Sequence, residues 1–202
     1  MDNAKIQFSA DELRLVTDEQ FILTKNRIIE KISIFFGLLQ NSYRIASADI
    51  FASLGIMQQP KISRGENYNG LPYVILDYPK HFTKDDIFAI RTMFLWGNDF
   101  SITLHLKGRY KTLFEKPLIK NVPLLKHRGW HLQTSGNEWQ HHYAHDTHVP
   151  VNIITAHEMA PVIEGASFIK IAFYFPLQQW DEAEQLFSNC FFSVINALDL
   201  TA

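Results

Sequence analysis

The stretch NGLPYVILDY at residues 69–78, with IFAIRTMFLWGNDFSITLHLK at residues 87–107, decides the fold. Asn69-Gly70 is the preferred residue pair for a tight type I′ turn, and Gly97-Asn98 is a second plausible two-residue turn. The residues on either side of both turns alternate in polarity and are rich in β-branched and aromatic types, as strands are. The sequence therefore predicts two antiparallel hairpins, the first of which begins near Ile62.

The loop length of the second hairpin decides which side chains share a face of the sheet. With the Gly97-Asn98 pair as the whole loop, Met93 lies opposite Ile102. Arg91 and His105 then point to opposite faces, because successive strand residues alternate. Apolar residues occur on both faces, so we expect both to be covered.

Four further strand segments follow in the sequence. Gly136-Asn137 is a third plausible two-residue turn, and it predicts a hairpin that joins residues 130–135 to residues 138–143. Residues 149–155 and 167–175 are further strand candidates, the second with a clear run of β-branched and aromatic residues.

Helical spacing marks both ends of the chain. Ser9 and Glu12 form the pattern of a capping box, and the long helix behind it carries apolar residues at near-helical intervals. After Pro176 the spacing becomes helical again, with acids in the first turns. The helices predicted in this way span residues 9–16, 18–43, 50–54, 110–120 and 178–198.

The order of these elements indicates the fold class. Helices come first, strands follow and a helix ends the chain, whereas a parallel sheet would need alternating strands and helices. We expect an α+β fold, with a mainly antiparallel sheet built from hairpins and packed with a long N-terminal helix and a C-terminal helix. It is predicted to be one domain over residues 1–202, divided into an N-terminal helical segment (1–59), a sheet region (60–176) and a C-terminal helix (177–202).

Composition excludes several classes of partner. Nineteen basic and twenty-one acidic side chains give a formal net charge of −2, so no overall field favours nucleic acid or an anionic membrane. The longest nearly apolar run, residues 32–39, is too short to span a bilayer, which needs about 20 residues. Cys190 is the only cysteine, which suits a reducing compartment. These features predict a soluble, cytoplasmic protein.

Two charges stand inside otherwise apolar strands, Asp77 and Arg91. Buried charges are rarely tolerated unless they are paired or bind a ligand. An ion pair between adjacent strands is the first interpretation. The alternative is a pocket for an anionic or polar small molecule, and the predicted ligand-binding residues are Tyr73, Asp77, Arg91 and His105, with Arg64 and Glu66 as further neighbours.

Seven of the nine histidines lie between residues 127 and 157. Imidazole is the commonest protein metal ligand, so this density predicts a possible zinc or iron site. The ligand set with most freedom is His141, His145 and His148, with Asp146 or Glu158 as a base. Known spacings fail, however: His157-Glu158 begins an HExxH motif, but Pro161 replaces the second histidine. In the predicted hairpin, His141 would be a packed, hydrogen-bonded residue instead.

Three hypotheses about function follow. The leading one is a noncatalytic module that binds a small polar ligand or a protein partner on the sheet, because the catalytic templates fail. The alternative is a metal-dependent hydrolase that uses the histidine cluster. The third is a structural or oligomeric role.

Overall fold

A single antiparallel sheet organises the molecule, and its strands follow the order β1-β2-β3-β4-β7-β5-β6. The computed structural model describes residues 6–56, 59–126 and 129–200. The strands are β1 (Lys61–Tyr68), β2 (Leu71–Phe82), β3 (Ile87–Leu95), β4 (Asp99–Lys107), β5 (Trp130–Gln133), β6 (His148–Pro150) and β7 (Phe168–Pro176). The predicted α+β class is confirmed, with a long N-terminal helix and a C-terminal helix beside the sheet.

Three of the α-helices that the structure describes flank the strands in the sequence, and three lie between strands. They are α1 (Ala10–Val16), α2 (Glu19–Ser53), α3 (Arg109–Lys120), α4 (Val122–Lys126), α5 (Ala156–Gly165) and α6 (Ala183–Ala197), with short 3-10 turns η1 (Val151–Ile153) and η2 (Leu177–Glu182). The predicted capping box of α1 forms between Ser9 and Glu12. Two predictions need correction. α2 continues through Ser53 and absorbs the short helix expected over residues 50–54, and α5, which opens with its own capping box, was not predicted.

The first hairpin forms as predicted. Tyr68 and Leu71 are the last paired residues of β1 and β2, which leaves Asn69 and Gly70 as the two-residue loop. Their φ angles of 52° and 80° are both positive, as a type I′ turn requires.

The second hairpin differs from the prediction by one residue. Phe94 pairs with Phe100, so the loop contains Trp96 as well as Gly97 and Asn98. Gly97 takes a φ of 69° as the third residue of the turn that the Asn98 N–H closes on the Leu95 carbonyl, a position where glycine is favoured. A shift of one residue turns every side chain of one strand to the other face. Arg91 and His105 therefore lie on the same face of the sheet, which reverses the prediction.

The predicted hairpin around Gly136-Asn137 does not form. Instead β5 pairs with β7 on one side and with β6 on the other, and residues 134–147 connect β5 to β6. The Asn137 side chain accepts a bond from the Trp139 N–H, and its carbonyl accepts one from Gln133 Nε2, so the turn is held locally without a second strand. The strand expected over residues 149–155 is reduced to β6, followed by η1. We call residues 134–147 the strap.

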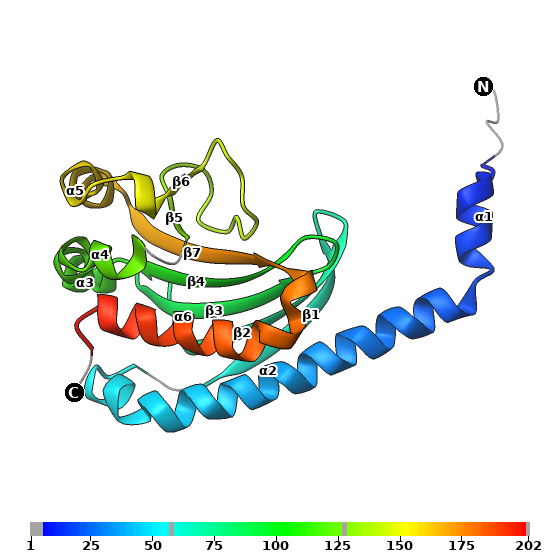
Figure 1. The fold of residues 1–202 in the computed structure, drawn as a ribbon, viewed down its shortest axis with the longest axis horizontal. Helices are drawn as coiled ribbons and strands as arrows, with labels where there is room; N and C mark the ends of the chain where they lie inside the picture. The colour runs from blue at the N-terminus through cyan, green and yellow to red at the C-terminus, as the bar shows by residue number, and fades with distance from the viewer. Residues whose placement is uncertain (1–5, 57–58, 127–128, 201–202) are drawn as a thin grey trace.

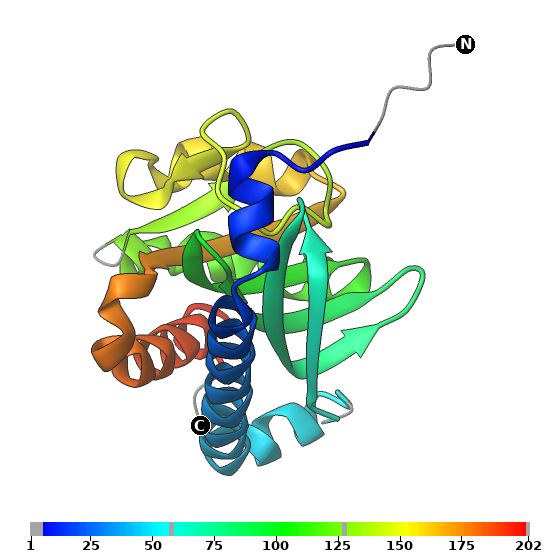
Figure 2. The same cartoon turned by 90° about the vertical axis from the view of Figure 1, so that its right-hand side faces the viewer.

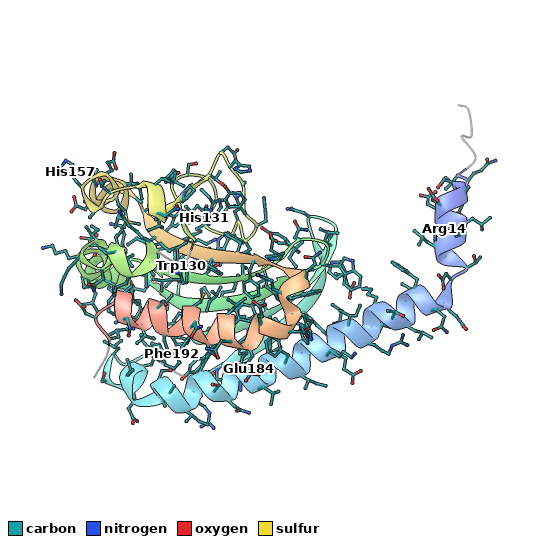
Figure 3. All side chains as sticks on the ribbon, viewed as in Figure 1. Arg14, Trp130, His131, His157, Glu184 and Phe192 are labelled. Carbon is teal, nitrogen blue, oxygen red and sulfur yellow. The ribbon has the colours of Figure 1, made fainter. Side chains whose placement is uncertain are left out.

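Helices cover one face of the sheet, and the strap covers part of the other. Figures 1 and 2 show α2 and α6 side by side along one face, where they bury an aromatic core. Phe191 of α6, for example, stacks on Tyr43 of α2 with ring centroids 4.0 Å apart. The strap lies on the opposite side (Figure 1), and Figure 3 labels Trp130 and His131 of β5, whose side chains point to the helix side and the strap side respectively. Within the described ranges, no helix is both long and apolar enough to cross a membrane.

Candidate functional site

The face of the sheet under the strap carries an unusual number of buried polar residues, which we call the polar face. Strand alternation places them there, since Asp77, His105 and Lys170, for example, each lie between two residues of the apolar core on the other face. The buried or half-buried members that carry charge or an imidazole include Asp77, Lys80, Arg91, Asp99, His105, Lys107, Lys170, His131 and His148.

Asp77 and Arg91 are direct partners across β2 and β3. The guanidinium of Arg91 donates from Nε to Asp77 Oδ1 at 2.7 Å and from Nη2 to Oδ2 at 2.9 Å. Their side chains are 15% and 7% exposed, so the pair is largely removed from water. The predicted ion pair is confirmed, and its two parallel bonds fix the plane of the guanidinium.

His141 of the strap makes the third hydrogen bond of the Arg91 guanidinium. Arg91 Nη1 lies 2.7 Å from His141 Nε2, and since arginine can only donate, Nε2 is the acceptor and the proton resides on Nδ1. Burial, followed by the nearby cations Arg91 and Lys170, lowers the pKa of His141 to about 2. The imidazole is therefore neutral at physiological pH.

Tyr68, at the end of β1, ties the strap to the sheet. Its hydroxyl accepts a bond from the His141 backbone N–H at 2.6 Å. The same hydroxyl lies 2.8 Å from Nδ1 of His142, within hydrogen-bond distance. One phenol thus fixes two consecutive strap residues, and it sets the position from which His141 reaches Arg91.

A second group of charges lies deeper under the strap. Lys170 of β7 is 3% exposed and donates to the Gln140 carbonyl, while Lys107 donates to Glu138 Oε1 at 2.9 Å. Burial and the positive charge of Arg91 lower the pKa of Lys170 to about 7, although Glu138 acts in the other direction. Three basic side chains, Lys107, Lys170 and Arg91, therefore lie beneath the strap. Two carboxylates, Asp77 of the sheet and Glu138 of the strap, lie there together with them.

His105 of β4 lies beside this group but is not charged. Burial, with smaller contributions from Lys170, Arg91 and Lys107, lowers its pKa to about 3. Its Nε2 lies 3.5 Å from Glu138 Oε2, a contact at the limit of a hydrogen bond. Because the imidazole is neutral, this contact is polar and is not an ion pair.

An open cleft of about 470 Å³ lies beside the strap, over strands β1, β2 and β3. Its walls combine aromatic rings with cations. The lining residues are Lys61, Ser63, Tyr68, Tyr73, Ile75, Asp77, Lys80, Phe82, Arg91, Trp139 and His141. Gly65 allows the Tyr73 ring to lie flat against β1, since a Cβ at this position would meet the Tyr73 hydroxyl oxygen at 2.5 Å.

The structure brings together three of the four predicted ligand-binding residues. Tyr73, Asp77 and Arg91 line the cleft. His105 shares their face but is buried beneath the strap, at a small void that Arg91 and Lys170 also border. The further neighbours do not line the cleft: Arg64 pairs with Val74, whose side chain belongs to the core of the other face, and Glu66 bonds Lys25.

The predicted metal ligands face different partners. His141 bonds Arg91, and His145 Nδ1 lies 2.9 Å from the Tyr143 hydroxyl. His148 is buried, with Nδ1 2.9 Å from the Thr147 hydroxyl and Nε2 3.3 Å from the Tyr174 hydroxyl, and burial lowers its pKa to about 4. Among residues 6–56, 59–126 and 129–200, no three His, Cys, Asp or Glu side chains are grouped to hold a metal ion. A zinc or iron site, and a hydrolase built on it, therefore stays a prediction without a geometric basis here.

Several residues of the site escaped the sequence analysis, among them Lys61, Tyr68, Lys80, Phe82, Trp139 and Lys170. Lys170 offered a signal, since it is a charge within the apolar run of residues 167–175, as Asp77 and Arg91 are within theirs. Trp139 and Tyr68 offered none, because their roles depend on where the strap lies.

Comparisons of the chain with protein families, with curated proteins and with solved structures find no match. The geometry of the cleft is therefore the basis for assigning a function.

Proposed function

We propose that this chain is a noncatalytic binding module, and that its ligand is a small anion with a flat ring, held in the cleft beside the strap. One observation carries the proposal, the unbalanced positive charge of the cleft. Asp77 is neutralised by Arg91, whereas Lys61 and Lys80 have no hydrogen-bond or ion-pair partner within the described part of the chain. An anion would balance these two cations.

Arg91 is suited to anchor such an anion. A guanidinium has five N–H groups, and three are used by Asp77 and His141 in the described residues. The remaining two are available to phosphate or carboxylate oxygens, which a planar guanidinium binds well. Because the other three bonds fix its orientation beforehand, binding would cost little side-chain entropy.

The aromatic walls indicate the rest of the ligand. Tyr73, Phe82 and Trp139 line the cleft, and Trp139 is 46% exposed, so a flat ring could cover apolar surface that now faces water. The volume of about 470 Å³ falls in the range of small-molecule pockets, roughly 300 to 1,000 Å³. A cleft of this size suits a small molecule better than a protein interface, which spreads over about 800 Å² on each partner.

The hydrogen bonds of the cleft favour binding over catalysis. Both oxygens of Asp77 accept from Arg91, and so does Nε2 of His141. Neither group is therefore placed to take a proton from a bound molecule without losing the bond that holds Arg91.

Isothermal titration calorimetry with three probes tests the proposal. Phenyl phosphate carries both the anion and the ring, inorganic phosphate only the anion, and phenol only the ring. We expect phenyl phosphate to bind most tightly. Lys80→Gln should weaken it about fivefold, roughly 1 kcal/mol, whereas Lys84→Gln, a change at an exposed lysine in the next turn, should not.

Three results would overturn the proposal. The first is the absence of heat with all three probes at millimolar concentration, and the second is equal binding of phenyl phosphate to wild type and to Lys80→Gln. The third is a preference for phenol over phenyl phosphate, because the cations would then contribute nothing.

A further inference from the structure

The N-terminal end of the chain forms an arm, residues 6–31, whose outer part extends beyond the rest of the protein and whose base begins at Lys25, which bonds Glu66 of β1. Figure 1 shows α1 and the first turns of α2 extending past the sheet, and Figure 3 shows the side chains around Arg14 standing apart from it. Residues Ala10–Val16, all of which the structure describes, include no buried residue. The first buried residue of α2 is Ile29.

The arm is nonetheless rich in large apolar side chains. Eight of them are exposed, by 37% to 101%: Ile6, Phe8, Leu13, Leu15, Val16, Phe21, Ile22 and Leu23. Exposed apolar side chains gathered in one segment indicate an interaction surface. Eight such side chains can supply an area of the order that a stable interface buries on each partner, roughly 800 Å².

An apolar cleft of about 280 Å³ lies at the base of the arm, where α2 meets the sheet. Ile28 and Ile32 of α2 form one wall, and Trp96 and Trp180 contribute to the others. The full lining is Ile28, Ile32, Phe94, Trp96, Gly97, Phe100, Leu177 and Trp180. The molecule thus carries exposed apolar side chains and an apolar hollow at the same end.

The charges along the arm would be complementary between two copies whose arms run in opposite directions. Residues 11–19 hold four acids, Asp11, Glu12, Asp18 and Glu19, against one base, Arg14. Residues 25–31 hold three bases, Lys25, Arg27 and Lys31, against one acid, Glu30. Lys25 is already bonded to Glu66 of β1, so Arg27 and Lys31 are the two bases without an acidic partner in the described residues. Because α1 turns away from the axis of α2 after Val16 (Figure 1), in an antiparallel pair of arms centred on residues 21–23 the acidic α1 of each copy crosses the basic segment of the other.

We infer that two copies of this chain pair through their arms in this antiparallel arrangement. Such a contact is isologous, because the same surface is used by both copies. It brings Phe21, Ile22 and Leu23 of both copies together at the two-fold axis. It also places α1 of each copy beside Ile28 and Ile32 of the other, where its apolar side chains meet the cleft at the base of the arm.

The charge pattern selects a second copy over a lipid surface as the occupant. Helices that bind anionic membranes carry an excess of Lys and Arg on their polar face. The outer part of the arm is acidic, so such a membrane would repel it. A second copy offers a basic segment, with Arg27 and Lys31, on the part of α2 that α1 would cross.

A charge-exchange experiment tests the inference, with molar mass measured by analytical ultracentrifugation across a range of concentrations. One full-length variant carries Arg27→Glu and Lys31→Glu, and another carries Asp11→Lys and Glu19→Lys; all four side chains are exposed, and none of them caps a helix. We expect wild type to dimerise and each variant alone to dimerise at least tenfold more weakly. An equimolar mixture of the two should recover the dimer, because each acidic segment again meets a basic one.

The matched control is Lys84→Glu with Lys116→Glu, which changes the net charge as much as the first variant but at exposed positions off the arm. It should dimerise as wild type does. The inference is overturned if wild type is a monomer at every concentration, if either arm variant dimerises as wild type does, or if the mixture fails to recover the dimer. Recovery in the mixture also shows that neither variant is misfolded.

Discussion

The two faces of the sheet are built on opposite principles. On one, α2 and α6 bury a core of aromatic and aliphatic side chains, among them Phe36, Phe187 and Phe191 with no exposed area. On the other, the strap covers charged and polar groups and leaves an open cleft beside them. The first face is expected to supply most of the stability, because apolar burial is the dominant favourable term in folding. The second holds buried polar groups that contribute little net stability, which is why we place the function there.

The largest effect should come from the helix-covered face. Phe191→Ala removes a fully buried ring that stacks on Tyr43 and touches Phe51 and Tyr78. We expect the free energy of unfolding to fall by about 3 to 5 kcal/mol, from lost burial and the cavity left behind. Urea denaturation would measure it, with Trp139→Ala in the strap as the matched aromatic truncation. If the two changes cost the same, the contrast between the faces is wrong.

The next largest effect on stability should come from the ion pair of the polar face, when one of its two partners is removed. Arg91→Met leaves the Asp77 carboxylate buried without its partner, and we expect a loss of about 3 kcal/mol. Asp77→Asn should cost a similar amount, while the double variant should cost clearly less than the sum. A double-mutant cycle by urea denaturation tests this. Strict additivity would show that the two side chains do not stabilise one another.

Lys170 should give the protein a pH dependence in the alkaline range. Its folded pKa of about 7 lies below the ordinary lysine value of 10.5, so between these pH values the unfolded state binds the proton and the folded state does not. Stability should therefore rise with pH in this window, on the order of 2 kcal/mol from pH 7 to 9. Lys170→Met should remove the rise, and Lys116→Met, at an exposed position, should retain it. A wild type with no rise would contradict the assignment.

The smallest effect should be local. Tyr68→Phe removes the hydroxyl that bonds the strap at residues 141 and 142, worth about 1 kcal/mol. Hydrogen exchange should then quicken at strap amides while α6 amides keep their rates. Equal acceleration on both faces would mean that the strap does not open on its own.

The sequence predicted those parts of the fold that depend on neighbouring residues. The turn at Asn69-Gly70 and the capping box at Ser9 need only a few consecutive residues, and both formed. The turn near Gly97 was misjudged by one residue, because a two-residue and a three-residue loop both accept glycine there. The strap was missed because β5 pairs with β7, a long-range choice that outweighed the local signal at Gly136-Asn137.

The same division applies to the site. The pairing of Asp77 with Arg91 was predictable, since charges inside apolar strands need a partner, and Lys170 obeys the same rule although it was overlooked. The contribution of Trp139 to the cleft follows from the path of the strap over the sheet, which no local pattern encodes. The histidine density predicted a metal site that stays a prediction, and in the described residues His141, His145 and His148 contact separate partners.

The most direct test of the account is a map of where a ligand binds. In two-dimensional amide NMR spectra of the labelled protein, titration with phenyl phosphate should shift the signals of Tyr73, Arg91 and the Trp139 indole. Signals of α6 on the other face should stay in place. Shifts confined to the helix-covered face, or spread evenly over the molecule, would contradict the claim that the polar face is the functional one.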